Sequence, residues 1–392
     1  LEQVEKVPAK FRGDLLAVVV NRRYEKALPA LLKYVEADDE DLSRVAVNGL
    51  AVLGSSDNID ILLRELANPA SEEVGSALSK AVIEIARKNS DLDLRSAPVR
   101  DALEGATDDY RNRLVEILGY LGGDKAWSEI DRTLLSGNKA AREAALRGLA
   151  SWPNGEPAQT VFKIAKGDSD PVTRGLALRT YVYMLKSPSS TPEEQRAERI
   201  RELLGTEGIA GRTRMELMGA LSSMATPEAE AVAAEFASDP VLAAHAEMAE
   251  KEIGIAIEKV AKADGGDLLL RAANATVFGE SGFRFDPAAV AIVGWSYPGY
   301  YVTWPILFVE PGEYEVVVKA ASPPGGGGEY EVTLGASRLT SETPKGDRFV
   351  EQRLGTVAIT KPGTFRLTVK GTSQREEGGS VMQLRSVELR PK

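Results

Sequence analysis

The sequence predicts an α-solenoid over residues 1–263 and an antiparallel β-sandwich over residues 264–392. Three observations lead to this prediction. A helix pair recurs with a period of roughly 30–40 residues through the first part, as in stacked helical repeats. The helical period stops at the Ala-Asp-Gly-Gly-Asp stretch of residues 263–267. Beyond it, apolar residues alternate with period two, which is typical of half-buried strands.

The repeat is clearest in the second helix of each pair, because these segments align without gaps. Their apolar residues recur at helical spacing and form one stripe along each helix. Small residues at Ala46, Ala145 and Ala177 allow neighbouring helices to approach closely. We expect second helices at residues 44–54, 76–86, 112–122, 143–152, 175–184 and 215–225. We expect first helices at residues 26–35, 58–67, 98–105, 124–135, 157–166 and 192–204, with a last pair at 227–236 and 241–263.

The N-terminal end of the array is unusual. Residues 11–22 have the pattern of a second helix whose first-helix partner is short or absent. A solenoid end without a polar cap exposes an apolar face. Residue 1 is Leu1 rather than Met. We therefore expect a processed or excised chain, and a further domain upstream in the gene would explain this start.

Arginines recur near the starts of the second helices, and several of these helices end in an apolar-Leu-Gly sequence. The arginines are Arg44, Arg111, Arg142, Arg174 and Arg214. This pattern resembles HEAT-type repeats, and the resemblance implies a scaffold or adaptor. The arginines either bond to loop carbonyls and to acids such as Asp170 between layers, or contact a ligand. We favour the structural role.

In the second part, short strands with frequent turn signals predict the sandwich. Turns are expected at residues 310–312, 323–325 and 361–363. Pro305 is expected to mark a bulge or a sheet edge, because proline lacks the N–H that a central strand needs. Two strands show a clear apolar face, formed by Tyr314, Val316, Val318 and Ala320 in one and by Phe365, Leu367 and Val369 in the other.

Several motifs of the second part occur together: Gly294-Trp295, Tyr-Tyr-Val-Thr-Trp at 300–304, and Pro-Gly-Glu-Tyr-Glu-Val at 311–316. They resemble the carbohydrate-binding β-sandwiches that follow bacterial α-L-fucosidases and sulfatases. The resemblance implies a galactose-binding-like jelly roll that is a non-catalytic appendage. Related modules often hold calcium through acidic residues on their first and last strands. The corresponding stretches here contain Arg271 and Arg385 instead, so no metal is expected there.

The composition excludes several classes of function. A net charge of −10 and an isoelectric point near 5.1 oppose binding to a polyanion such as nucleic acid. No apolar stretch is long enough to span a membrane. The chain has no cysteine, which excludes disulfides, thiolate catalysis and Cys-based metal sites. Sandwich appendages of this kind occur mainly outside the cytoplasm, so the resemblance implies a periplasmic or secreted bacterial protein.

No catalytic chemistry is expected. His245 is the only histidine, so neither a zinc set nor a Ser-His-Asp triad can be built around it. The Gly-rich stretch 205–213 lacks the lysine and spacing of a phosphate loop and is expected to be a turn. Asp168 and Asp170 suggest either calcium or a helix start whose dipole they complement, and we favour the helix start. We therefore expect no enzyme activity, no catalytic residue, no cofactor and no metal.

The candidate site for a protein partner lies on the second helices. If these helices line the concave side, two rows of side chains face a partner: Asn48, Lys80, Glu116, Arg147 and Arg179 in one, and Val52, Glu84, Tyr120, Ser151 and Tyr183 in the other. Tyrosine and arginine are enriched at protein-binding hot spots. We therefore expect Tyr120, Arg147, Arg179 and Tyr183 to bind a protein. The alternative is an ordinary solvated face.

The candidate site for a glycan lies beside the Pro298-Gly299 turn. Trp295, Tyr297 and Tyr300 cluster there in the sequence and either stack on a saccharide or pack within the protein. Three functions therefore remain open. The first is a non-catalytic scaffold or adaptor for protein–protein association in an extracytoplasmic assembly. The alternatives are a glycan-binding protein that uses its sandwich, and an accessory region of a larger secreted enzyme.

Overall fold

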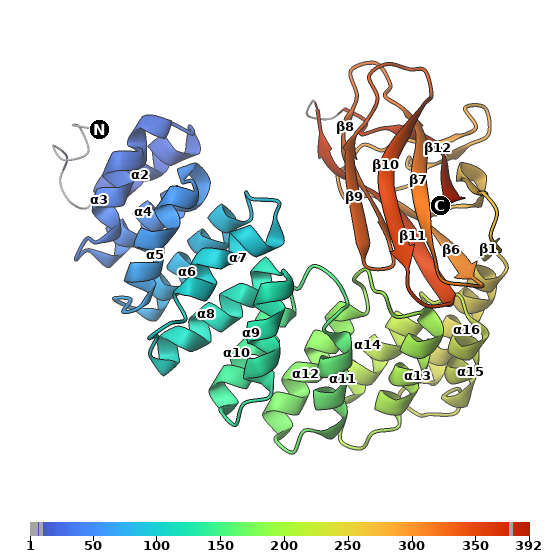
Figure 1. The fold of residues 1–392 in the computed structure, drawn as a ribbon, viewed down its shortest axis with the longest axis horizontal. Coiled ribbons are helices and arrows are strands. Elements are labelled where there is room, and N and C mark those ends of the chain that lie inside the picture. The colour runs from blue at the N-terminus through green and yellow to red at the C-terminus, as the bar shows by residue number, and fades with distance from the viewer. Residues whose placement is uncertain (1–6, 8–10, 376–378) are drawn as a thin grey trace. The chain divides into compact units, whose positions relative to one another are not determined.

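The computed structural model describes residues 7, 11–375 and 379–392, which form helices followed by two β-sheets (Figure 1). This order confirms the predicted fold class. By its contacts the chain divides into two compact units: unit 1 comprises Leu1–Pro153 and Lys163–Tyr183, and unit 2 comprises Asn154–Phe162 and Met184–Lys392. The last helices therefore belong to the same unit as the sandwich. The first strand, β1 (Ala261–Ala263), begins before the expected boundary at residues 263/264.

The helices of unit 1 pack in the predicted pairs. Each of α4, α6, α8 and α10 contacts its own first helix, and these second helices contact one another in sequence. Helix α2 (Arg12–Asn21) packs on α4 as a second helix would, which agrees with the pattern of residues 11–22. The second helices are α4 (Glu40–Leu53), α6 (Glu72–Ala86), α8 (Asp108–Leu121), α10 (Lys139–Leu149) and α12 (Pro171–Met184). The first helices are α3 (Leu28–Val35), α5 (Ile59–Leu66), α7 (Leu92–Asp101) and α9 (Asp124–Leu134), while α11 (Ala158–Gly167) is divided between the two units after Phe162.

The crossing of α8 and α10 depends on two glycines. A Cβ atom on Gly119 would lie 2.3 Å from the carbonyl carbon of Gly148, and one on Gly148 would lie 2.4 Å from the carbonyl oxygen of Glu116. Both contacts are with backbone, which cannot rotate away as a side chain can. The two helices therefore approach closely only because neither position carries a side chain. Ala145, one of the small residues singled out in the sequence, is also fully buried here.

Helix α7 begins earlier than its sequence pattern predicts. The carboxylate of Asp91 accepts hydrogen bonds from the amides of Asp93 and Leu94 at 3.0 and 2.9 Å. These bonds satisfy N–H groups that have no partner inside the helix. The helix therefore starts at Leu92 rather than at residue 98, and Pro98 lies inside it.

Unit 2 combines helices α13 to α16 and the first residues of α11 with the sandwich. Helix α13 packs on α14 and α15, and α16 packs on α14 and α15. Sheet A has the strand order β1-β6-β11-β8-β9, with β3 also paired to β6; sheet B has the order β10-β7-β12-β5-β4, with β2 also paired to β12. All pairings are antiparallel except that of β1 with β6. The helices are α13 (Glu193–Leu204), α14 (Gly211–Leu221), α15 (Pro227–Glu235) and α16 (Ala243–Ile257). The strands after β1 are β2 (Leu268–Arg271), β3 (Thr276–Phe278), β4 (Arg284–Asp286), β5 (Ala291–Val293), β6 (Tyr301–Phe308), β7 (Gly312–Ala321), β8 (Gly328–Leu334), β9 (Ser337–Glu342), β10 (Val350–Ile359), β11 (Gly363–Gln374) and β12 (Gln383–Pro391).

The two sheets enclose one apolar core, as the alternating strands predict. The inward side chains of β7 and β11 are buried together with those of β6, β8 and β12. They include both predicted strand faces: Tyr314, Val316, Val318, Ala320, Phe365, Leu367 and Val369. Trp304 is also buried in this core, and its indole Nε1 donates to the carbonyl oxygen of Arg271 at 3.0 Å.

Pro305 marks neither a bulge nor a sheet edge, which corrects the sequence-based expectation. It lies in the middle of β6, whose register with β11 is continuous. On the other side of β6, β3 pairs with residues 301–303 and β1 pairs with residues 306–308. Pro305 therefore falls in the gap between two short partner strands, where no amide donor is required.

Helix α13 contacts strand β11 within unit 2. The Glu194 carboxylate accepts hydrogen bonds from the Thr364 amide at 2.9 and 3.0 Å and from the Thr364 hydroxyl at 2.7 Å. The neighbouring Glu193 forms an ion pair with Arg366 at 3.3 Å and accepts from the Ala225 amide at 2.7 Å. The sandwich is therefore fastened to the last helices by charged and hydrogen-bonded groups. We call these contacts the α13–β11 junction.

Candidate functional site

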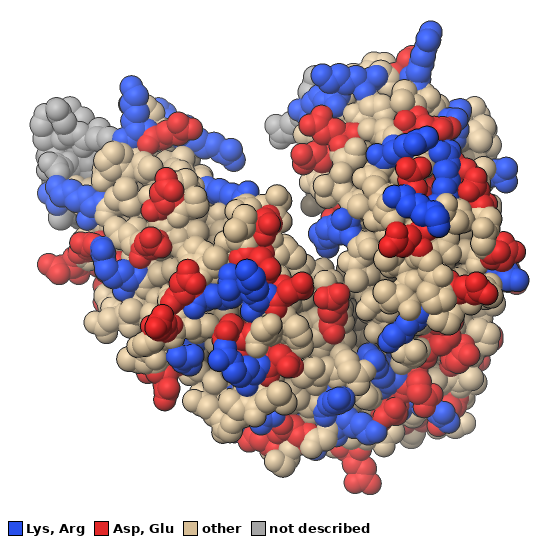
Figure 2. Space-filling view, viewed as in Figure 1, with Lys and Arg blue, Asp and Glu red and all other residues tan. Residues whose placement is uncertain are grey.

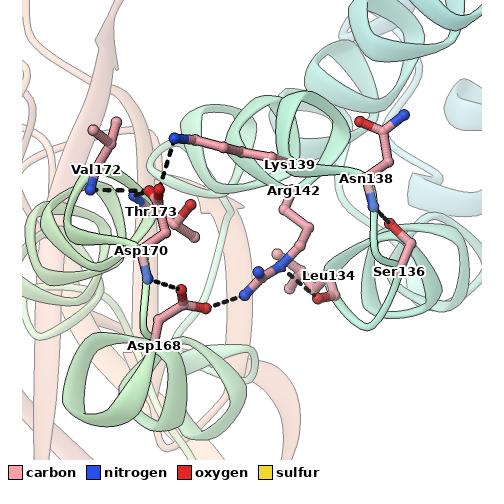
Figure 3. A network of polar contacts seen from close by, with 9 residues as sticks. All are labelled: Leu134, Ser136, Asn138, Lys139, Arg142, Asp168, Asp170, Val172 and Thr173. Atoms are coloured by element: carbon pink, nitrogen blue, oxygen red, sulfur yellow. Dashed lines mark hydrogen bonds and ion pairs between the residues drawn. The ribbon is translucent and has the colours of Figure 1, made fainter.

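Two of the arginines at the starts of second helices, Arg142 and Arg214, form ion pairs with the next helix pair, and Figure 3 shows that of Arg142. Arg142 donates from Nε to the carbonyl oxygen of Leu134 at 3.1 Å and pairs with the carboxylate of Asp168. Beside it, the Lys139 ammonium lies 2.7 Å from the Asp170 carboxylate. The pattern recurs in other layers: Arg111 donates to the Leu103 carbonyl at 2.7 Å, and Arg214 pairs with Asp239 at 2.7 Å. The structural role predicted for this series is therefore confirmed at Arg111, Arg142 and Arg214.

Asp168 and Asp170 are occupied by contacts with the chain itself. Asp170 accepts from the amides of Val172 and Thr173 at 3.0 and 2.9 Å, and so caps the start of α12. The hydrogen bond from Lys139, followed by that from Thr173, lowers the pKa of Asp170 to about 2. Helix capping, the role that we favoured from the sequence, is what these bonds perform.

The exposed parts of α4, α6, α8, α10 and α12, which we call the second-helix face, carry all four residues predicted to bind a protein. Tyr183 is 57% exposed, and Arg179 is exposed one turn before it on α12. Arg147 on α10 pairs with Glu116 on α8 at 3.0 Å. Tyr120, one turn after Glu116, is half-buried. The structure thus links Arg147 to the helix that carries Tyr120, and places Arg179 and Tyr183 together on α12.

A hollow of about 340 Å³ lies on the second-helix face, with Tyr120 in its lining. Its lining comes from α6 and α8 and includes the aliphatic side chains of Ile83 and Ile117. Arg87 also lines it, donates to the Tyr120 carbonyl at 3.0 Å and has its guanidinium carbon 5.9 Å from the centre of the Tyr120 ring. Ile83 and Arg87 were not among the site residues predicted from the sequence. The sequence signal that could have indicated them is their distance from Glu84 of a predicted row: Ile83 is one residue before it and Arg87 three residues after it.

An ion pair connects the helices that line this hollow. Both guanidinium nitrogens of Arg113 bond to the Glu72 carboxylate, at 3.2 and 2.5 Å. This bond and the charge of Arg113 lower the pKa of Glu72. The pair joins α8 to the start of α6 across the hollow. The arrangement is a preformed surface that combines aliphatic, aromatic and charged groups.

Trp295 cannot serve as an exposed sugar platform, which corrects one of the expectations for the sandwich. It is fully buried, and its indole Nε1 donates to the Tyr300 carbonyl at 3.0 Å. Phe283 covers it, with ring centres 4.7 Å apart. The sequence alone does not distinguish this buried indole from an exposed one, because the loop around it is fixed by contacts with Phe283.

The other two predicted aromatic residues of the sandwich remain accessible. Tyr297 is 60% exposed, and Tyr300 is half-buried, with ring centres 5.5 Å apart. Partial burial and the nearby Glu280 raise the pKa of Tyr300. Next to them in the fold, Phe278 of β3 stacks on Tyr301 of β6 with ring centres 4.6 Å apart. Phe278 was not predicted from the sequence, because β3 is too short to show a pattern.

Two other features considered from the sequence lie on an exposed helix surface and in a turn. His245 is exposed on α16, and residues 205–210 join α13 to α14 as a turn. Within residues 7, 11–375 and 379–392, no group of three or more His, Cys, Asp or Glu side chains is arranged to hold a metal ion. Over that same part of the chain, every helix is too short or too polar to cross a bilayer.

Comparisons with known proteins give similarity to separate parts of the chain. No protein-family model and no curated protein matches it. Similar solved structures include the archaeal HEAT-like repeats protein from Thermococcus onnurineus NA1, at 18% identity over 56% of this chain and 92% of that one, with a TM-score of 0.34. They also include the CBM35 from Cellvibrio japonicus Abf62, at 16% identity over 32% of this chain and 92% of that one, with a TM-score of 0.25.

A third similar structure is a Podospora anserina GH26-CBM35 β-(1,4)-mannanase, at 18% identity over 33% of this chain, with a TM-score of 0.28; the chain spans 28% of that enzyme's length. These structures are of the two kinds that the sequence resembles, a HEAT-like repeat protein and carbohydrate-binding modules. The narrower resemblance to modules of fucosidases and sulfatases stays an expectation. At these identities and TM-scores the likeness says nothing of function. The fold class follows from the helix pairs and strand order described above.

Proposed function

We propose that this protein is a non-catalytic binding protein that docks a protein partner on the second-helix face of unit 1. The main support is the hollow between α6 and α8, where Ile83, Ile117 and Tyr120 occur among charged side chains. Protein-binding hot spots combine aromatic and arginine side chains with packed apolar groups. The ion pairs that Arg142 and Arg214 form between layers lie at the starts of the second helices. The exposed side chains of the middle turns are therefore available to a partner.

The charge of this face suits a protein rather than a polyanion. Basic and acidic side chains are interspersed over the helices in the view of Figure 2. The lining of the hollow alone includes Lys80, Arg87 and Arg113 beside Glu84 and Glu116. Mixed charges steer and orient a protein of complementary pattern. Exposed apolar groups continue the face beyond the hollow, at Val52 and Tyr183.

The test is a comparison of full-length chains in binding to proteins of the native source. Alanine at Tyr120, Arg147, Arg179 and Tyr183 together is expected to abolish at least one specific association, because each hot-spot residue contributes about tenfold or more in affinity. The matched control carries alanine at Arg132 and Leu135, which are exposed on or next to α9. The proposal is wrong if every association is the same in both variants.

A second candidate function is saccharide binding by the sandwich, favoured by the accessible Tyr297 and Tyr300. Their rings form a small aromatic surface, and aromatic rings stack on the apolar faces of sugars. A glycan-array screen followed by titration tests this. Saturable binding that is lost in Tyr297→Ala and kept in an exposed control, Tyr24→Ala, would support it. Binding unchanged in Tyr297→Ala would exclude this surface.

The remaining alternative is an accessory region of a larger secreted enzyme. The mass and N-terminal sequence of the protein isolated from its native source would distinguish that case from a separate binding protein. For either case we propose a bacterial periplasmic or secreted location. Cell fractionation tests it, and recovery in the cytoplasmic fraction would reject it.

A further inference from the structure

A hollow of about 370 Å³ lies on the outward face of sheet B and is not explained by the surfaces above. Strands β2, β4, β7, β10 and β12 all contribute to its lining. Its apolar part is formed by Leu269, Phe285, Val290 and Val317. The volume is within the range of small-molecule sites, which is about 300–1,000 Å³.

A β-bulge directs two consecutive side chains of β12 into this hollow. The register of β12 against β7 shifts between Leu384 and Ser386, so Arg385 is the extra residue. Leu384 points into the core, whereas both Arg385 and Ser386 line the hollow. On the other side of β12, Ser386 pairs with Arg271 of β2, which also lines the hollow. Bulges of this kind often re-aim side chains at functional sites.

The charges around the hollow leave two arginines without a carboxylate partner. Lys319 pairs with Glu351 at 3.2 Å, and Glu388 pairs with Arg390 at 2.6 Å. Among the residues that the structure describes, no ion pair forms at Arg271 or at Arg385. The two acids that line the hollow are therefore neutralised by other bases, and an uncompensated positive charge remains.

Arg385 is held in place by contacts other than ion pairs. Its guanidinium carbon lies 3.7 Å from the centre of the Phe349 ring, and one terminal nitrogen donates to the Ala289 carbonyl at 3.1 Å. Its Nε atom is buried and finds no hydrogen-bond acceptor among the residues that the structure describes. A buried N–H without an acceptor is unfavourable, so the stacking on Phe349 and the bond to Ala289 hold the guanidinium in this position at a cost. The guanidinium is thus pre-oriented and incompletely satisfied.

We infer that this hollow binds a small organic carboxylate, with Arg271 and Arg385 holding the carboxylate and the apolar lining contacting the rest of the ligand. Arginine suits this role because its planar fork matches a carboxylate and stays charged at all relevant pH. A sugar acid and an aliphatic or aromatic acid share this chemistry. The site is on unit 2, so the inference stands or falls separately from the partner-binding proposal for unit 1.

The experiment titrates the full-length chain at low ionic strength by NMR or calorimetry. The probes are glucuronate, hexanoate and benzoate, each with its uncharged counterpart, glucose, hexanamide or benzamide. At least one acid is expected to bind with a millimolar or lower Kd, about tenfold or more below the Kd of its counterpart. Which acid binds distinguishes a sugar acid from an apolar acid as the ligand source.

Two variants and a matched control locate the binding. Arg271→Gln is expected to raise the Kd by about tenfold, because it removes a charged hydrogen-bond donor. Arg385→Gln is expected to do the same, and Arg271→Gln keeps the test valid if Arg385→Gln does not fold. Arg353→Gln, at an exposed arginine of β10 outside the hollow, is expected to leave the Kd unchanged. The inference is overturned if no acid binds below about 10 mM, if acids and counterparts bind equally, or if Arg271→Gln behaves like Arg353→Gln.

Discussion

Replacing Arg366 by methionine tests whether the α13–β11 junction stabilises unit 2. Arg366 pairs with Glu193, which is only 3% exposed, and also donates to the carbonyl of Ser223 and, at 3.4 Å, to the Thr303 hydroxyl. In Arg366→Met the Glu193 carboxylate stays buried and keeps the hydrogen bond from the Ala225 amide. The variant therefore leaves the Glu193 carboxylate buried without its counter-ion.

The expected loss follows from this geometry. Removing one partner of a buried ion pair costs about 3–5 kcal/mol in the free energy of unfolding. The Arg366 side chain is 23% exposed, so water reaches the vacated position and we expect the lower end, about 3 kcal/mol. For a unit of this size, that corresponds to a decrease of about 6–12 °C in Tm.

The assay is differential scanning calorimetry of the full chain, with hydrogen exchange to assign the affected transition to unit 2. Faster exchange is expected first at the Thr364 amide, which donates to Glu194. In the double variant Glu193→Gln/Arg366→Met no charge is buried, so most of the stability should return. The control Arg353→Met removes an exposed pair with Glu315 and should shift Tm by little, because surface pairs contribute about 0–1 kcal/mol. The reasoning is refuted if the double variant is as unstable as Arg366→Met, or if Arg366→Met behaves like the control.

Three further predictions concern single positions. Gly119→Ala places a Cβ 2.3 Å from the backbone of α10 and should destabilise unit 1 by about 3 kcal/mol, measured by urea unfolding. In the control Gly137→Ala the new Cβ has no atom within 4 Å, so stability should not change. Equal effects of the two changes would contradict the close crossing of α8 and α10. Gly363→Ala forces a φ of +134° on alanine and places its Cβ 2.6 Å from Pro192, the residue directly before α13. The Tm of unit 2 should therefore fall, and an unchanged Tm would count against the junction. By NMR, the pKa of Asp170 should be near 2 and should rise towards 3.8 in Lys139→Gln. Because the folded pKa is lowered, the contribution of Asp170 to stability is present above pH 3.8 and is lost as the pH falls through about 2. A normal pKa in the parent chain would disprove the pair with Lys139.

Local patterns were sufficient to predict most elements of the fold. The second helices appear where the apolar stripes recur, and the alternating strands around Val316 and Leu367 are buried as expected. Errors occurred where one side chain or one distant strand decided the outcome. The Asp91 cap moved the start of α7, and the split pairing of β6 accommodated Pro305 in mid-strand.

The candidate sites were less predictable than the fold. Helical spacing was enough to place Tyr120 and Tyr183 on the second-helix face. It did not predict the hollow beside Tyr120, because the hollow depends on how α6 and α8 pack. Trp295 and Tyr297 are two residues apart, yet one is fully buried and the other is largely exposed. Such a difference depends on loop packing, which has no periodic signature.

The sequence by itself determined the helical repeat, the change to strands near residue 263 and the exclusion of cysteine chemistry, because each of these depends on composition or on neighbours along the chain. Only the tertiary structure decided that the last helices join the sandwich, through contacts such as Glu194 with Thr364, 170 residues apart. It also decided that a bulge at Arg385 places this arginine in the lining of the same hollow as Arg271. Contacts of this kind depend on strand register and on the packing of distant segments, which a single sequence does not encode in any local pattern.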